Sequence, residues 1–276
     1  MTRIYKKFEN LKSYSKTCLI SYITAGDPCL SDTLTIMNTL VDSGTDIIEL
    51  GIPFSDPMAD GPIIQRACER AIKQNVSCKD IFNLVKVFRK ENNDIPIILM
   101  GYLNPIEIMG YELFAKSASE AGVDAILVVD LPHEEAEEII GIFKKFKLES
   151  IFLVSPNTKI DRIKKILKYA SGFLYYVSLK GVTGATSLNI DETLKQLKFI
   201  KDSVNLPLAV GFGIKDAETA KLLSISADAV VIGSAIVKII EKHSNTDKEK
   251  TYNDIKNLIH PIRKALDENL IIGDNL

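Results

Sequence analysis

Short apolar segments alternate with longer amphipathic stretches along almost the whole chain of 276 residues, and this alternation restricts the fold more than any other feature. Each apolar segment is nearly continuous in Ile, Leu, Val, Ala, Met or Tyr, which is typical of strands buried on both faces of a parallel sheet. The predicted strands are residues 18–24, 47–51, 95–101, 125–129, 150–154, 173–178, 208–211 and 229–233.

The repeated order of strand and helix predicts a (β/α)8 barrel, the TIM barrel, because this number of units fits the length of the chain. An open doubly wound sheet is the alternative, and it usually carries a Gly-x-Gly-x-x-Gly turn after its first strand. Here the first strand leads instead into Ala25-Gly26-Asp27-Pro28. No Gly/Ser-rich linker divides the chain, so we expect residues 1–276 to form one barrel domain with extra helices at 2–14 and 248–267.

Three of the predicted strands are entered through the same kind of segment, a small residue or glycine followed by aspartate. Asp46, Asp124 and Asp228 each stand directly before a strand. This recurrence resembles a repeated helix-to-strand turn.

The composition excludes several classes of function. Hydrophobic residues make up 46% of the chain and the formal net charge is −2, so a nucleic-acid partner is not expected. The four cysteines form no Cys-x-x-Cys pair and no metal-binding spacing with histidine, which favours free thiols in a reducing compartment. We find neither a signal-peptide pattern nor an apolar run of the ~18 residues that span a bilayer, and we expect a cytoplasmic protein.

Glu49 places a carboxylate within the otherwise apolar strand Ile47-Ile48-Glu49-Leu50-Gly51. A buried charge without a partner is unfavourable, so this residue needs either a structural partner or a chemical role. Burial raises the pKa of a carboxyl group toward neutrality, where it can both donate and accept protons. The proline-rich loop after the strand carries a second carboxylate, Asp60. These two residues are the predicted catalytic carboxylates.

Residues that follow the strands are expected to gather at one end of the barrel, because the active site of a (β/α)8 barrel forms at the C-terminal ends of its strands. Tyr102 and Asn104 follow the third predicted strand, Asp130 and His133 follow the fourth, and Tyr175 lies on the sixth.

Glycines at the ends of the last two predicted strands indicate a phosphate-binding site. They let the backbone approach a ligand closely, and a helix that begins after Gly233 would present free N–H groups to an anion. Simple turns would explain either glycine motif alone, but many barrels bind phosphate at these two strands. The connection after the sixth strand suits a mobile lid with backbone donors. The predicted phosphate-binding residues are Thr183, Gly184, Phe212, Gly213, Gly233 and Ser234.

Two other classes of barrel enzyme are disfavoured. A metal-dependent aldolase would use several histidines, but His243 and His260 lie in the C-terminal helical region. A Schiff-base enzyme needs a lysine in its pocket, and no predicted strand contains one. Carboxylate acid–base chemistry on a substrate with an uncharged body and a phosphate group remains, and no metal site is predicted.

The segment from Glu49 to Pro62, Glu-Leu-Gly-Ile-Pro-Phe-Ser-Asp-Pro-Met-Ala-Asp-Gly-Pro, resembles the signature of the tryptophan synthase alpha chain family. Further matching segments follow in order from about Tyr22 to Gly233, and the set is highly specific. They are Thr24-Ala25-Gly26-Asp27-Pro28, Met100-Gly101-Tyr102-Leu103-Asn104-Pro105, Asp130-Leu131-Pro132, Tyr175-Tyr176-Val177-Ser178, Gly181-Val182-Thr183-Gly184 and Gly211-Phe212-Gly213-Ile214.

The resemblance implies cleavage of indole-3-glycerol phosphate to indole and glyceraldehyde 3-phosphate, with Tyr175 near the glycerol hydroxyls as a third catalytic residue. No cofactor is expected in this chain, whereas a partner beta chain would carry pyridoxal phosphate within an α2β2 heterotetramer. The indole is expected to contact apolar strand residues, namely Tyr22, Met100, Leu127, Val129 and Leu153. The beta chain is expected over the strand exits, at Asp56, Pro57, Asn104, Pro132 and Gly181, where Met58 and Ile106 would add apolar surface.

Three segments depart from the family pattern. Ser21 stands where proline is usual, Asn157 follows Ser155-Pro156 where threonine is common, and the lid reads Ser178-Leu179-Lys180-Gly181 in place of Ser-Arg-Ala-Gly. The lid departure bears on closure and rate rather than on the type of reaction.

Two alternative functions share some of these features. One is another phosphate-binding barrel such as indole-3-glycerol-phosphate synthase, which would require a lysine on a strand. The other is a catalytically weakened barrel that mainly activates its partner, against which the presence of both Glu49 and Asp60 argues.

Overall fold

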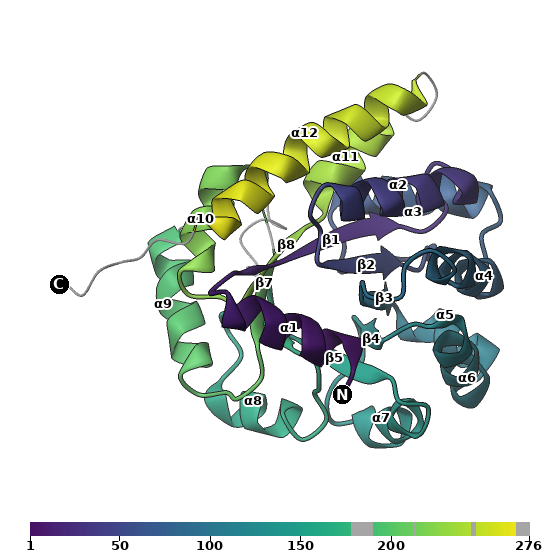
Figure 1. Ribbon diagram of the computed structural model, residues 1–276. Coiled ribbons are helices and arrows are strands. Elements are labelled where there is room, and N and C mark those ends of the chain that lie inside the picture. The colour runs from purple at the N-terminus through teal and green to yellow at the C-terminus, as the bar shows by residue number, and fades with distance from the viewer. Residues whose placement is uncertain (178–189, 212, 244–246, 269–276) are drawn as a thin grey trace.

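Parallel strands form a closed barrel in the computed structural model, which describes residues 1–177, 190–211, 213–243 and 247–268. Each strand pairs with the next in sequence, and β8 pairs with β1 to close the barrel (Figure 1). The strands are β1 (Cys18–Thr24), β2 (Ile47–Gly51), β3 (Ile97–Gly101), β4 (Ala125–Val128), β5 (Glu149–Val154), β6 (Leu174–Val177), β7 (Leu208–Gly211) and β8 (Ala229–Ile232). The predicted (β/α)8 fold is therefore confirmed.

Helices surround the barrel, and α1 lies across one of its ends (Figure 1). The predicted additional helices are present as α1 and α12, and α12 packs along α10, α11 and α2. The helices are α1 (Arg3–Ser13), α2 (Leu30–Asp42), α3 (Pro62–Lys73), α4 (Cys78–Arg89), α5 (Leu103–Met109), α6 (Tyr111–Ala121), α7 (Ala136–Lys145), α8 (Ile160–Ile166), α9 (Ile190–Lys201), α10 (Ala217–Ser224), α11 (Ser234–His243) and α12 (Lys248–Asp267). Among these helices, none combines the length and apolar character needed to cross a membrane.

The third strand begins two residues later than predicted. Pro96 has no N–H to donate, although its carbonyl oxygen accepts a hydrogen bond from the Ile48 N–H at 3.0 Å. Regular pairing starts at Ile97, whose own N–H donates to the Asp124 side chain at 2.8 Å.

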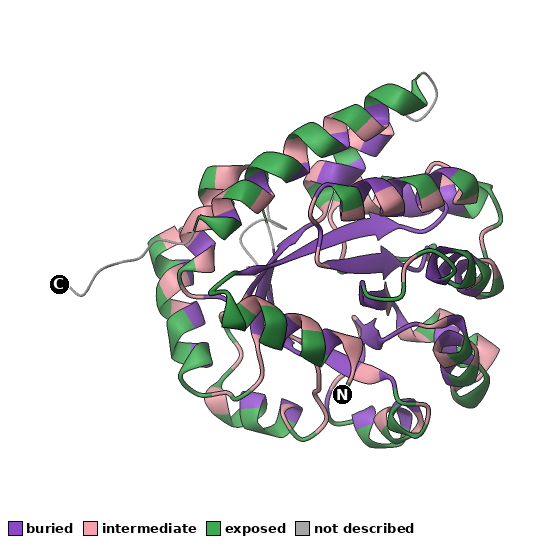
Figure 2. Cartoon of the chain, viewed as in Figure 1, coloured by how far each residue is buried: buried purple, intermediate pink, exposed green. Residues whose placement is uncertain are grey.

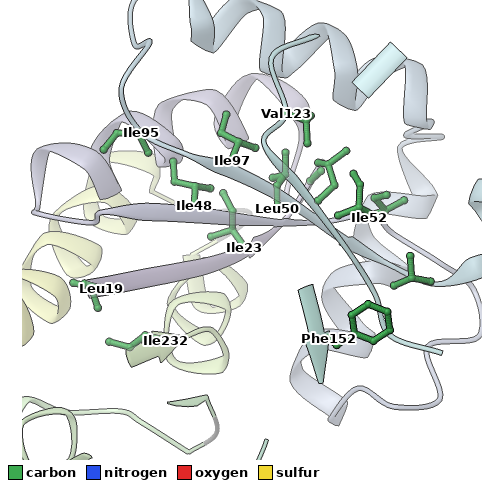
Figure 3. Close-up of a cluster of buried hydrophobic side chains, with 14 of the residues drawn as sticks. Leu19, Ile23, Ile48, Leu50, Ile52, Ile95, Ile97, Val123, Phe152 and Ile232 are labelled. Carbon is green, nitrogen blue, oxygen red and sulfur yellow. The ribbon is translucent and has the colours of Figure 1, made fainter. Parts of the chain in front are cut away.

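Each strand contributes to two apolar layers because its side chains alternate between opposite faces. The outer layer packs against the helices, and Figure 3 shows part of it around Leu19, Ile48 and Leu50. The inner layer fills the barrel and is closed at the N-terminal end by α1, where the Phe8 and Phe173 rings lie 5.8 Å apart. Both strand faces are consequently buried, whereas the helices expose their outer faces (Figure 2).

The recurring aspartates form the predicted entry turns at the N-terminal end of the barrel. The side chains of Asp46, Asp124 and Asp228 accept hydrogen bonds from the N–H groups of Leu19, Ile97 and Leu208, at 2.8 to 2.9 Å. Each aspartate N–H donates in return to the carbonyl oxygen of the same residue. Each side chain thus ties the start of one strand to the start of the preceding strand.

Candidate active site

Glu49 points into the barrel near the C-terminal ends of the strands. Its neighbours Ile48 and Leu50 belong to the outer layer, whereas Ile47 belongs to the inner layer, so alternation turns the Glu49 carboxyl group inward. On the adjacent strand β1, Tyr22 lies in register with Glu49.

The Glu49 carboxyl group is buried without compensation. The residue is 1% exposed, and neither carboxyl oxygen has a hydrogen-bond partner among the described residues. Burial, and secondarily the negative charge of Asp60, raises the pKa of Glu49 from 4.5 to about 8. The group is therefore protonated at neutral pH but still close enough to its pKa to exchange a proton.

Asp60 lies nearby in the loop that leads into α3, and Tyr102 orients it. The Tyr102 hydroxyl donates to Oδ2 of Asp60 at 3.0 Å and accepts from the Ala59 N–H at 3.0 Å. Burial raises the pKa of Asp60 to about 6, while the Tyr102 hydrogen bond opposes the shift. Asp60 is thus ionised at neutral pH, when Glu49 is not. The two predicted catalytic carboxylates are brought together in different protonation states.

Tyr102 is a residue whose role the sequence did not reveal. Its position after a strand placed it at the correct end of the barrel, but its partner was not predicted. The ring also packs against Phe54, with centroids 5.4 Å apart. A hydroxyl-bearing aromatic residue directly after β3 was the available signal.

Two glycines make room for tyrosines inside the barrel. A Cβ at Gly51 would collide with the Tyr22 hydroxyl, and one at Gly211 would collide with the Tyr175 hydroxyl. The Tyr22 hydroxyl hydrogen-bonds to Thr24 Oγ1 at 3.2 Å. Burial, followed by the nearby charges of Glu49 and Asp60, raises the pKa of Tyr175. Both phenols therefore stay protonated at neutral pH.

The residues predicted to contact indole all belong to the inner side of the barrel. Met100, Val129 and Leu153 are partly exposed, whereas Leu127 is fully buried below them. Val129 and Leu153 also line a cavity of about 260 Å³. That cavity extends to Phe152 on the outer face of β5 and to Ile166 of α8, so it lies over the barrel rim rather than on its axis.

The predicted phosphate site is described only in part, because Thr183, Gly184 and Phe212 lie outside the described residues. Gly213 is exposed with a φ of 70°, a left-handed conformation that favours glycine. Helix α11 begins at Ser234, and its first bonded N–H groups, those of Ile236 and Val237, donate to the Gly233 carbonyl. The preceding N–H groups of the first turn have no partner within the helix and are available to an anion.

The residues predicted to face a partner have unequal exposure. Asp56 and Asn104 are exposed, Pro57 and Pro132 are partly exposed, and Gly181 lies outside the described residues. The expectation for Ile106 is wrong: α5 turns this side chain into the core, where it is fully buried. Met58 and Ile108 are instead the apolar side chains exposed beyond β2 and β3, at 76% and 80%.

Within the part of the chain that the structure describes, no group of three or more His, Cys, Asp or Glu side chains is arranged to hold a metal ion. His133, which follows β4, has its Nδ1 atom 2.8 Å from the Glu134 carboxylate.

The chain is similar to known proteins over nearly its whole length. The family model described as tryptophan synthase alpha chain matches residues 8–266. The tryptophan synthase alpha chain of Marinobacter nauticus is 49% identical over 267 residues, which cover 97% of this chain and 98% of that protein. The structure of tryptophan synthase subunit alpha from Legionella pneumophila is 46% identical with a TM-score of 0.90, and covers 97% of this chain and 99% of that chain. A chain in the structure of the tryptophan synthase a2b2 complex from Pyrococcus furiosus is 40% identical with a TM-score of 0.82, and covers 90% of this chain and 98% of its own.

Proposed function

The chain belongs to the tryptophan synthase alpha chain family, and on that premise we propose how its residues cleave indole-3-glycerol phosphate to indole and glyceraldehyde 3-phosphate. The observation that carries the proposal is the buried Glu49 carboxyl group without a hydrogen-bond partner among the described residues and with a pKa of about 8. A carboxyl group in this condition begins the reaction as an acid and can then act as a base.

Glu49 performs both proton transfers. Its carboxyl proton goes to C3 of the indole ring, and the resulting carboxylate takes the proton of the hydroxyl on the adjacent glycerol carbon. The carbon–carbon bond then breaks, its electron pair returns to the indole ring, and the hydroxyl-bearing carbon becomes the aldehyde. Glu49 regains a proton, so the acid is regenerated in each cycle.

Asp60 stabilises the charge that develops during this reaction. Protonation of C3 leaves positive charge on the indole nitrogen, and an anion that accepts its N–H hydrogen bond favours that state. Asp60 is suited to this role because it is ionised at neutral pH and held by Tyr102. Tyr175 is assigned to the glycerol hydroxyls, which a protonated phenol can hydrogen-bond.

The two ends of the substrate are bound by different chemistry. Backbone N–H groups at the start of α11, with Gly213 and the residues Thr183, Gly184 and Phe212, hold the phosphate. The apolar inner side chains contact the indole ring. These are Tyr22, Met100, Leu127, Val129 and Leu153.

We infer that the chain works with a beta chain in a two-alpha, two-beta assembly, docked over the C-terminal ends of the strands. The a2b2 complex of the Pyrococcus relative supports the assembly. The exposed Met58 and Ile108 support this face as the contact surface, because their apolar side chains lie in solvent in the segments that follow β2 and β3, where a partner would cover them. Pyridoxal phosphate is assigned to the beta chain, and none of the steps above uses it. The free cysteines fit a reducing, cytoplasmic location.

The test is an assay of indole released from indole-3-glycerol phosphate, first by the isolated chain and then with its cognate beta chain. We expect release by the isolated chain and faster release by the pair. Absence of indole in both assays would overturn the proposed function. Indole only from the beta chain mixture, unchanged when Glu49→Gln replaces the wild-type chain, would favour a barrel that mainly activates its partner.

A further inference from the structure

Four charged residues form a cluster beside α3 that takes no part in the proposed chemistry. Arg70 makes a bidentate contact with the Asp27 carboxylate, at 2.7 and 2.8 Å, and donates to Glu241 at 3.0 Å. Arg66 makes a second bidentate contact with Glu241, at 2.6 and 2.9 Å. Bidentate pairs of this kind fix orientation as well as distance. We call Asp27, Arg66, Arg70 and Glu241 the anchor cluster.

The anchor cluster joins three segments that surround the proposed site. Asp27 lies in the turn after β1, both arginines lie on α3, and Glu241 lies on α11. Helix α3 begins two residues after Asp60, and α11 begins with the N–H groups assigned to phosphate. The cluster therefore connects the helix that follows Asp60 to the helix that starts the phosphate site.

The inner side of α3 packs against the same neighbours. Ala67 of α3 lies in one apolar cluster with Tyr22 of β1 and Val237 of α11. The Gln65 side chain donates to the Asp60 carbonyl oxygen at 2.8 Å, which ties the start of α3 to the catalytic loop. A shift of α3 would consequently move Asp60 with it.

The Cys68 thiol of α3 is influenced by charges of both the anchor cluster and Asp60. The thiol is buried and has a backbone hydrogen bond with Phe54 in the loop before Asp60. Burial raises the pKa of Cys68 to about 11, and the charges of Asp60 and Asp27 add to the shift while Arg70 opposes it. The Cys68 thiol thus experiences the charge of Asp60 as well as the charges of Asp27 and Arg70 in the anchor cluster.

We propose that the anchor cluster holds α3 between the turn after β1 and helix α11 and thereby sets the position of Asp60 relative to Glu49, with Arg70 as its central positioning residue. The inference rests on the proposed function, because the position of Asp60 matters only if Asp60 acts on the substrate. Small displacements of a reacting group lower the rate steeply, so loosening α3 should lower turnover without removing any group that contacts substrate.

Glu241 is the residue to change, because its side chain is 27% exposed whereas that of Asp27 is fully buried and paired with Arg70. Glu241→Gln removes the charge that both arginines share and leaves the Asp27 pair intact. Glu112→Gln is the matched control: Glu112 also accepts from a cation, Lys145 at 2.7 Å, but lies on α6 away from the site. Glu241→Asp, which keeps the carboxylate, tests for rescue.

We expect Glu241→Gln to lower kcat about fivefold or more, on the order expected for a partial displacement, with KM changed less than twofold. Glu112→Gln should leave both unchanged, and Glu241→Asp should recover part of the rate.

The carboxyl pKa of Glu49, measured by 13C NMR, should shift in Glu241→Gln alone, because it responds to the Asp60 charge. The titratable groups that respond to that charge are Tyr22, Glu49, Cys68, Tyr102 and Tyr175.

Equal kcat and equal Glu49 pKa in the two Gln variants would overturn the positioning role, even if Glu241→Gln melts at a lower temperature. The proposed function would survive that result, since the wild-type chain would still release indole. If the wild-type chain releases none, the proposed function fails, and the Glu49 titration still tests whether the anchor cluster positions Asp60.

Discussion

Carboxylates are buried at both ends of the barrel, but those at the N-terminal end have ion-pair and hydrogen-bond partners that Glu49 at the C-terminal end lacks among the described residues. At the N-terminal end, Asp124 accepts from Arg89, Arg3 and the Ile97 N–H, all within 2.9 Å. Asp46 is paired with Arg263 at 2.6 Å in the same manner. At the C-terminal end, neither oxygen of Glu49 has a partner among the described residues.

This difference separates carboxylates that support the fold from one that is available for chemistry. A buried carboxylate held by cations and backbone N–H groups supports the fold, and its loss leaves the partners buried and unpaired. A buried carboxyl group without partners is neutral at neutral pH and lowers stability there, because the unfolded chain can ionise it, but it can transfer a proton. Glu149 is intermediate: burial raises its pKa, a hydrogen bond with Thr2 opposes the shift, and its Oε2 has no partner among the residues that the structure describes.

The largest effect is expected from Glu49→Gln. Turnover should fall between about 10²- and 10⁴-fold because no other group replaces the proton donor and acceptor. Stability at pH 7 should rise, since the unfolded wild-type chain gains free energy by ionising Glu49 above pH 4.5 and the amide cannot ionise. Indole production and urea unfolding of the same variant measure both quantities. A folded variant with near-normal turnover would remove Glu49 from the mechanism.

The opposite pattern is expected from Asp124→Asn. Breaking this buried network should lower the free energy of unfolding by about 3 kcal/mol, because Arg89 and Arg3 lose their shared anion. The kcat of the folded variant should stay within about twofold of wild type, since the change lies at the end opposite the site. Denaturant titration with parallel kinetics checks this, and a rate loss as large as that of Glu49→Gln would abolish the distinction between the two ends.

Asp60→Asn tests whether Asp60 and Glu49, the two carboxylates at the C-terminal end, have different roles. Turnover should fall on the order of 10²-fold, the scale for one lost electrostatic contact in the transition state, with KM affected less. The pKa of Glu49 should fall below about 8 because a nearby negative charge is removed. If Asp60 only caps the loop, the variant would instead lose about 1 kcal/mol of stability with kcat unchanged.

The last expected effect is a dependence of the free energy of unfolding on pH that is caused by Glu49. Its pKa is raised from 4.5 to about 8 in the folded protein, so the folded state keeps a proton that the unfolded chain releases above pH 4.5. Stability relative to Glu49→Gln should therefore be greatest below pH 4.5, decline by up to about 1.4 kcal/mol per pH unit, and level off above pH 8. Urea unfolding of both proteins between pH 5 and 8 measures the difference. Parallel curves would show that the Glu49 pKa is not raised.

The amino-acid sequence by itself determined the barrel and the identity of its two carboxylates. Buried parallel strands need continuous apolar segments, and this local pattern placed β1, β2 and β7 with their observed bounds. The capping box that starts α4, formed by Ser77 and Asp80, is equally local. Glu49 stood out because a carboxylate interrupts such a segment.

Only the tertiary structure decided how the carboxylates are held. Tyr102 contacts Asp60 across 42 residues of sequence, and Arg70 contacts Glu241 across 171. Side chains so far apart leave no periodic pattern in the sequence, because their contact depends on where the barrel places each strand end. The same reason explains why Ile106 was expected at the surface: its exposure depends on how α5 packs against the core, which no neighbouring residue specifies.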